Sequence, residues 1–139
     1  MKRNRLEIEY SFDFELLGLT TSAKGYKLAW ELNRCLKIRL QKKADLVITN
    51  RAKQETTYSL HVYETPVNTV RLFRNRPNEP HPAKNLLVPE FPHVDYIVMT
   101  QGDALPGNRL QEELKGIASI EWVAFIPLDS LKSKTNFIF

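Results

Sequence analysis

Residues 87–102, LVPEFPHVDYIVMTQG, contain several side chains whose types could support acid–base chemistry. Glu90 and Asp95 are two carboxylates close in the sequence, and His93 and Tyr96 stand beside them. Such groups can exchange protons with a substrate when they share a pocket. Consecutive strand residues point to opposite faces of a sheet, however, so Asp95 and Tyr96 are not expected to serve one pocket. Glu90 and Asp95 remain candidates for a polar docking point.

A structural role accounts for the same stretch, and we favour it over a working site. Pro89 restricts the backbone before the strand and reduces the entropy that is lost on ordering. Val94 and Tyr96 are expected on one face of a strand at residues 94–100, with the Tyr96 ring in the core and its hydroxyl at the margin. Asp95 would lie on the other face and need a donor, because an unpaired buried charge is costly.

Other familiar site patterns are missing from the sequence. The three histidines, His61, His81 and His93, are far apart, and none has a partner at the spacing of metal ligands. The five glycines form no dinucleotide-binding or phosphate-loop pattern, and no GxSxG nucleophile turn is present. We therefore assign no catalytic residue and expect neither a metal nor a cofactor, which leans against an enzyme without excluding one.

Basic residues exceed acidic ones by 20 to 16, which gives a net charge of +4. This mild excess permits nucleic-acid binding without requiring it. Lys42, Arg71 and Arg74 could form one basic surface, with Phe73 as a stacking residue between the two arginines. The alternative is that these cations solvate exposed strand faces and the end of a helix.

Cysteine occurs once, at Cys35, so no disulfide can form within the chain. Free thiols are typical of the reducing cytoplasm. Cys35 shares a helical face with Leu28 and Leu32, which favours a small buried apolar residue over a nucleophile. No apolar run approaches the roughly 20 residues of a membrane helix. We expect a cytoplasmic protein without membrane association.

Apolar periodicity predicts the secondary structure. Alternation and β-rich composition indicate strands at residues 10–19, 45–49, 57–64 and 69–74. Residues 94–100 and 120–128 are apolar on both faces, which also indicates strands, the first of them in the interior of the sheet. Helical spacing marks residues 23–39, which Thr20, Thr21 and Ser22 are placed to cap, and a shorter helix through Leu110 and Leu114. Two helices are too few to cover both faces of a parallel sheet. The order β-α-β-β-β-β-α-β therefore predicts one α+β domain over residues 1–139 with a mostly antiparallel sheet.

The segment VPEFPHVDY, residues 88–96, resembles the pattern IPExxxVDY, after which a bacterial protein family is named. The matching residues are Pro89, Glu90, Val94, Asp95 and Tyr96, with Val88 at the isoleucine position. FELLGL, YKLAWELN and the terminal LKSKTNFIF are also similar to that family, so the resemblance covers nearly the whole chain. It implies a small cytosolic bacterial protein and no established activity.

The leading functional prediction is a non-catalytic module that binds another protein or a second copy of itself. The apolar tail, Phe137 to Phe139, is its positive sign, unless the tail completes the protein's own core. The first alternative is an RNA-associated accessory protein that uses the basic residues. The second is a small-ligand domain or enzyme whose site forms only in three dimensions, recognisable by a deep pocket with titratable residues of shifted pKa.

Overall fold

The computed structural model describes residues 13–49, 51–78 and 86–138. Its elements are β2 (Phe14–Thr21), α1 (Gly25–Leu36), β3 (Gln41–Thr49), β4 (Glu55–Thr65), β5 (Asn68–Arg74), β6 (Tyr96–Gly102), α2 (Gly107–Lys115), β7 (Ile120–Ile126) and the terminal 3-10 helix η2 (Lys132–Phe137). This order confirms the predicted β-α-β-β-β-β-α-β arrangement and the α+β class. His81 and Phe139 lie outside the described residues.

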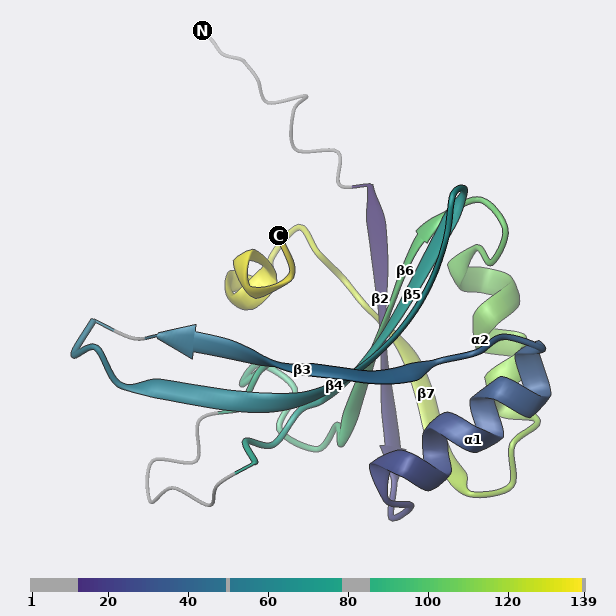
Figure 1. Cartoon of the computed structure of the whole chain (residues 1–139), viewed down its shortest axis with the longest axis horizontal. Coiled ribbons are helices and arrows are strands. Elements are labelled where there is room, and N and C mark those ends of the chain that lie inside the picture. Colours follow the sequence, from purple (N-terminus) through teal and green to yellow (C-terminus); the bar gives the residue numbers. More distant parts are fainter. Residues whose placement is uncertain (1–12, 50, 79–85, 139) are drawn as a thin grey trace, which may run out of the picture.

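The six strands form one antiparallel sheet in the order β3-β4-β5-β6-β2-β7 (Figure 1). β4 and β5 are the hairpin that the turn at Pro66 and Val67 predicts. β6 pairs with β5 on one side and β2 on the other, as expected for a strand that is apolar on both faces. β3 and β4 cross the direction of β2 and β7 in Figure 1, so the sheet is strongly twisted.

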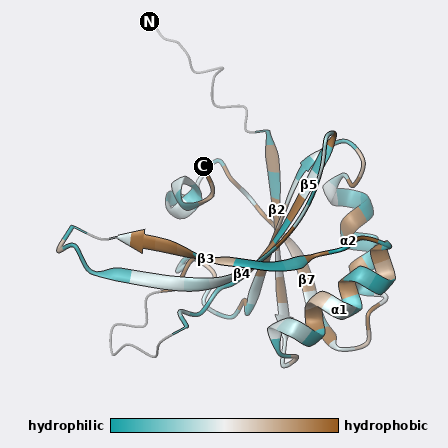
Figure 2. Cartoon of the chain, viewed as in Figure 1, coloured by the Kyte–Doolittle hydropathy of each residue, from teal (hydrophilic) through white to brown (hydrophobic). Residues whose placement is uncertain are grey.

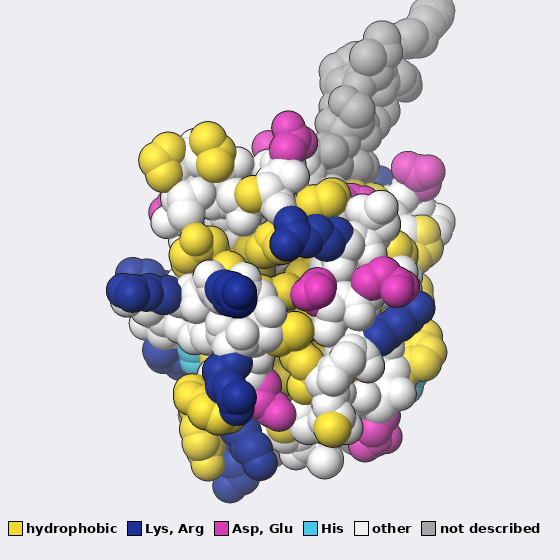
Figure 3. Space-filling view, turned by 90° about the vertical axis from the view of Figure 1, so that its right-hand side faces the viewer, with side chains coloured by type: hydrophobic (Ala, Val, Ile, Leu, Met, Phe, Trp, Pro, Cys, Tyr) yellow, Lys and Arg dark blue, Asp and Glu magenta, His cyan; other side chains and the backbone are white. Residues whose placement is uncertain are grey.

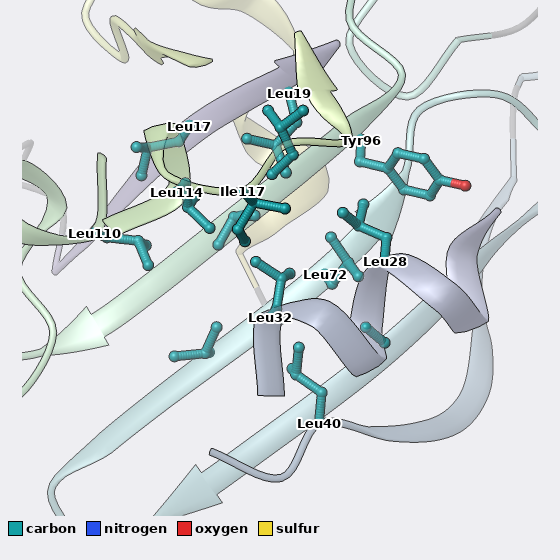
Figure 4. Packing of buried hydrophobic residues seen from close by; sticks show 14 of the residues in the cluster. Leu17, Leu19, Leu28, Leu32, Leu40, Leu72, Tyr96, Leu110, Leu114 and Ile117 are labelled. Carbon is teal, nitrogen blue, oxygen red and sulfur yellow. The ribbon is translucent and has the colours of Figure 1, made fainter. Parts of the chain in front are cut away.

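Helices α1 and α2 cover one face of the sheet (Figure 1). Figure 4 shows Leu28 of α1 and Leu110 of α2 in the same apolar cluster as Leu17 and Leu72 from the strands. These four leucines are at most 1% exposed. Their burial stabilises the fold because each fully buried leucine contributes about 1.5–3 kcal/mol relative to an exposed one.

The opposite face of the sheet is covered by residues 86–95 and by η2 (Figure 1). Leu87 and Val88 pack into this second core with no exposed surface. Phe137 of η2 meets Phe73 of β5 edge to face, with ring centroids 5.2 Å apart. Of the two alternatives for the apolar tail, the structure supports the internal one for Phe137, which is 1% exposed, whereas Ile138 is 57% exposed.

Asn75, which sequence reasoning did not single out, holds the segment at residues 86–95 in place. Its side chain is fully buried. The Asn75 Nδ2 group donates to the carbonyl oxygens of Val94, at 2.8 Å, and Phe91, at 3.3 Å. Its Oδ1 atom accepts from the backbone N–H of Val88 at 2.7 Å. One amide side chain thus replaces the ladder bonds that this irregular segment lacks.

The strand predicted at residues 94–100 does not begin at residue 94. β6 begins at Tyr96, and Val94 precedes it. Val94 packs into the second core, whereas Tyr96 belongs to the core under the helices, so the two do not share a face. Gly18 makes room for Val94, because a Cβ at Gly18 would lie 2.8 Å from Val94 Cγ2.

Two expectations for α1 are also wrong. The helix begins at Gly25 after Lys24, and no side chain caps it. The hydroxyl of Thr21 instead accepts from the backbone N–H of Ala23 at 3.1 Å, before the helix starts. The predicted start at residue 23 is thus two residues too early, and Tyr26 in the first turn is 72% exposed.

β3 is longer than predicted, and its two halves differ. Figure 2 shows a hydrophobic end around Leu46 and Ile48, which pack against the second core. The first half carries Lys42 and Lys43, and the register with β4 shifts between Lys43 and Leu46. Such a bulge increases the local twist. The extra residues place Lys42 directly opposite His61 of β4.

Candidate anion-binding pocket

The two carboxylates of the predicted docking point have separate partners. Glu90 accepts hydrogen bonds from the backbone N–H and the hydroxyl of Ser133, at 3.0 and 2.8 Å. Burial alone would raise the pKa of Glu90, but hydrogen bonds from its own backbone and from Ser133 together outweigh burial and lower the pKa. Asp95 Oδ2 accepts from the backbone N–H of Thr21 at 2.9 Å. Glu90 thus joins its loop to η2, while Asp95 joins the VDY segment to the end of β2.

Asp95 and Tyr96 line one pocket, contrary to the expectation from strand alternation. Asp95 belongs to the irregular approach to β6, where alternation does not apply. The pocket lies between the start of α1 and the sheet and has a volume of about 760 Å³. Sites for small molecules typically measure about 300–1,000 Å³.

Neighbouring strands form the floor of the pocket. Lys42 of β3 pairs with His61 of β4, and His61 pairs with Leu72 of β5. Arg74 of β5 pairs with Tyr96 of β6. Residues that pair across two strands lie on the same face of the sheet, and so does every second residue along one strand. All five of these side chains therefore lie on the face that the helices cover. The start of α1 lies beside these residues, and together they line the pocket.

Positive charge surrounds the pocket. Its charged lining residues are Lys24, Lys42, Arg74 and Arg76, against the single carboxylate of Asp95. Lys42 is paired with Asp45 at 2.8 Å. Across the part of the chain that the structure describes, no carboxylate forms an ion pair with the other three cations. Figure 3, which draws the side of the molecule that carries the helices, shows Lys and Arg side chains concentrated on the left of the view. An excess of unpaired cations in a concave site attracts anions.

The first turn of α1 opens onto the pocket through Lys24, Gly25 and Tyr26. The first intrahelical hydrogen bond runs from the N–H of Leu28 to the carbonyl oxygen of Lys24 at 2.8 Å. The N–H groups before it lack intrahelical partners and carry partial positive charge. No described side chain caps this end, so within the described residues these donors are available to an anion.

His61 lies on the pocket floor and is 9% exposed. Burial lowers its pKa below the usual 6.5, and the nearby Lys42 lowers it further, so the ring is neutral at pH 7. Among the described residues, none hydrogen-bonds this ring. A Cβ on Gly25 would lie 4.0 Å from His61 Cε1. The ring edge between the two nitrogens is therefore directed at the start of α1.

Tyr96 links the core under the helices to the pocket. Its ring is 6% exposed, and Figure 4 shows its hydroxyl directed away from the leucine cluster. The hydroxyl donates to the carbonyl oxygen of Ala23 at 3.1 Å. Burial raises the pKa of Tyr96, with Arg74 opposing and Asp95 adding to this shift. The expectation of a core ring with a marginal hydroxyl is confirmed.

Two of the four nucleic-acid candidates meet at this pocket, and two do not. Lys42 and Arg74 line it. Arg71 lies on the opposite face, where it donates to Gln101 Oε1 at 2.5 Å. Phe73 is fully buried, so the prediction of an accessible stacking residue is wrong.

Sequence reasoning did not place Lys24, His61 or Arg76 in a pocket. A signal for two of them was present. The predicted hairpin at residues 57–74 has a tight turn that places His61 opposite Leu72. Arg76 follows Arg74 at the spacing of one strand face. Nothing in the sequence indicated that the start of α1 would meet this face.

The remaining sequence candidates offer less chemistry. Cys35 is partly buried, and its thiol lies 3.4 Å from the carbonyl oxygen of Glu113. Burial raises the pKa of the Cys35 thiol, and the Glu113 charge adds to this, so the reactive thiolate is disfavoured. Within residues 13–49, 51–78 and 86–138, no three His, Cys, Asp or Glu side chains group as metal ligands. Neither α1 nor α2, nor any other described helix, has the length and apolar character to cross a membrane.

No protein-family model matches the chain, and no curated protein matches it. The resemblance of residues 88–96 to the IPExxxVDY family therefore stays a prediction. The structure nevertheless gives the pattern residues physical roles. Val94 fills the second core, Tyr96 and Asp95 reach the pocket, and Glu90 binds Ser133. Pro89 lies exposed in the turn that it forms with Glu90.

Proposed function

We propose that this protein binds a small anion of the phosphate class in the pocket at the start of α1. One observation carries the proposal: the first turn of α1, Lys24, Arg74 and Arg76 face the same pocket, and among the residues that the structure describes that turn has no side-chain cap and these three cations form no ion pair. Backbone N–H groups at a helix start and arginine side chains are the donors that phosphate oxygens commonly bind.

The pocket floor supports an anion rather than a cation. His61 is buried and neutral, so one ring nitrogen can donate to an oxygen. Asp95 opposes an anion electrostatically, but its Oδ2 atom is already engaged by the Thr21 N–H. The four lining cations outnumber this one carboxylate.

A two-dimensional NMR titration with inorganic phosphate at low salt tests the proposal. We expect the backbone amides of Gly25 and Tyr26 to shift together and to saturate at a single affinity. The variant Arg74→Gln should weaken binding about tenfold, because a charged hydrogen bond contributes roughly 1.5–3 kcal/mol. Folding should be unaffected, since Arg74 is exposed.

Lys115→Gln is the matched control, because Lys115 is an exposed cation on α2 outside the pocket. Equal affinities of the two variants, or phosphate shifts that spread over the surface without saturating, would contradict the proposal. High salt should weaken phosphate binding, whereas the predicted protein-interaction role through an apolar surface would persist in salt.

A further inference from the structure

We infer that the ligand is a nucleoside 5′-phosphate, with its phosphate at the start of α1 and its base against Tyr26. This inference rests on the proposed anion site and names the ligand class that fills the rest of the pocket. A single phosphate would occupy only a small part of about 760 Å³. The pocket therefore has room for an organic body beside the anionic group.

Tyr26 supplies a surface for a planar group. It lines the pocket from the first turn of α1 and is 72% exposed. Tyr26 belongs to the same turn as the N–H groups proposed to bind the phosphate, so a base stacked on its ring would stay within reach of a phosphate at the helix start. Aromatic side chains bind every base through its π-face, and stacking is largely independent of base identity.

The polar groups on the other side of the pocket suit a sugar. Asp95 lines the pocket and uses Oδ2 for the Thr21 N–H, and its second carboxylate oxygen is the acceptor that we assign to the sugar. Ser59 adds a hydroxyl to the same lining, and Leu72 provides an apolar contact on the floor. An acidic acceptor for ribose hydroxyls, placed near a phosphate-binding helix start, is a recurrent arrangement in nucleotide sites. Carboxylates do not favour a second anionic group, so one phosphate suits the site better than a polyphosphate.

Isothermal titration calorimetry with AMP, ribose 5-phosphate and inorganic phosphate tests the inference on the full chain. We expect AMP to bind at least about tenfold more tightly than ribose 5-phosphate, as one base stack provides. Tyr26→Ala should remove most of this difference and Tyr26→Phe should restore it. Trp30→Ala is the control, since Trp30 is an exposed aromatic residue of the same helix outside this pocket.

The failures of the two proposals are distinguishable. Equal binding of AMP, ribose 5-phosphate and phosphate would overturn the nucleotide inference and leave the anion site intact. No binding of any of the three would overturn both. An unchanged AMP preference in Tyr26→Ala would also overturn the inference.

The nucleotide could be free or the first residue of an RNA strand. Trinucleotides with a 5′-phosphate and with a 5′-hydroxyl separate these sources. Tighter binding of the 5′-phosphorylated trinucleotide than of AMP supports the inference and assigns the RNA end, whereas weaker binding supports it and assigns the free nucleotide. Equal binding of the phosphorylated and unphosphorylated trinucleotides would overturn it, because the terminal phosphate would then not be recognised.

Discussion

Asp95 accepts a hydrogen bond from the backbone N–H of Thr21 through Oδ2, at 2.9 Å, although the two residues are far apart in the sequence. This contact joins the approach to β6 to the end of β2. It thereby fixes two borders of the pocket relative to each other. Among the described lining residues Asp95 is the only acidic one, so its removal should separate a structural effect from an electrostatic one.

Asp95→Asn keeps an oxygen acceptor for Thr21 and removes the negative charge. We expect a loss of stability below about 1 kcal/mol, because a hydrogen bond remains, and a severalfold gain in affinity for inorganic phosphate. Asp95→Ala should gain a similar affinity but lose about 1.5–3 kcal/mol. Urea denaturation and phosphate titration measure the two quantities. Weaker phosphate binding by a stable Asp95→Asn would contradict the pocket electrostatics described above.

The second prediction concerns the contribution of the buried residue Phe137 to stability. Phe137→Ala removes the ring that packs edge to face on Phe73 and should cost about 3–5 kcal/mol of unfolding free energy. Ile138→Ala is the adjacent control and should stay within about 0.5 kcal/mol, because Ile138 is mostly exposed. Chemical denaturation at equilibrium distinguishes them. If Phe137→Ala retained full stability, the tail would be free for the predicted docking role.

Asn75 should be among the least replaceable polar residues. Asn75→Ala leaves the buried N–H of Val88 and the carbonyl oxygen of Val94 without partners, which should cost about 2–5 kcal/mol in total. Hydrogen exchange at Val88 should accelerate along with global unfolding. Asn108→Ala, on the exposed side of α2, serves as the control. A loss confined to a few tenths of a kcal/mol would mean that the loop packs without this side chain.

His61 makes stability and binding depend on pH in opposite directions. Its folded pKa lies below 6.5, so the unfolded chain binds the proton first as the pH falls. Stability that is fully present above pH 6.5 is therefore lost progressively below it, by at most about 1.4 kcal/mol per pH unit from this group. A bound anion favours the charged ring, so sulfate, whose charge stays constant, should bind more tightly at pH 5.5 than at pH 7.5.

His61→Gln should abolish most of both dependences. His93→Gln is the control, since His93 is exposed outside the pocket and its ring meets that of Trp122 at an angle of 59°, with centroids 4.9 Å apart. Thermal denaturation and sulfate titration across this pH range measure the effects. Identical pH profiles for the two variants would remove His61 from the pocket's chemistry.

Periodicity predicted the order of the elements because each strand and helix repeats apolar residues at its own spacing. It failed where residues leave regular structure. Asp95 was assigned to the other side of the sheet from Tyr96 because the strand was expected to begin at Val94. Phe73 looked accessible between two arginines, yet the tail residue Phe137 covers it.

The pocket was less predictable than the fold because it depends on long-range placement. Lys42 and Arg74 were recognised as basic candidates, but their pairing with His61 and Tyr96 follows from the register of four strands, β3 to β6. The decisive neighbour is the uncapped start of α1, and its position depends on how the helix packs on the sheet. Local sequence carries little information on that packing.

The position of β2 has a consequence for synthesis on the ribosome. β2 is the first described strand of the chain, yet it pairs with β6 and β7, where Leu16 lies opposite Met99 and Ile126. The chain cannot close the centre of its sheet until β6 and β7 have been translated, and loop closure over such separations is slow. Until then the apolar β2 stays unpaired, so the nascent chain has a prolonged interval in which chaperones must compete with misassociation.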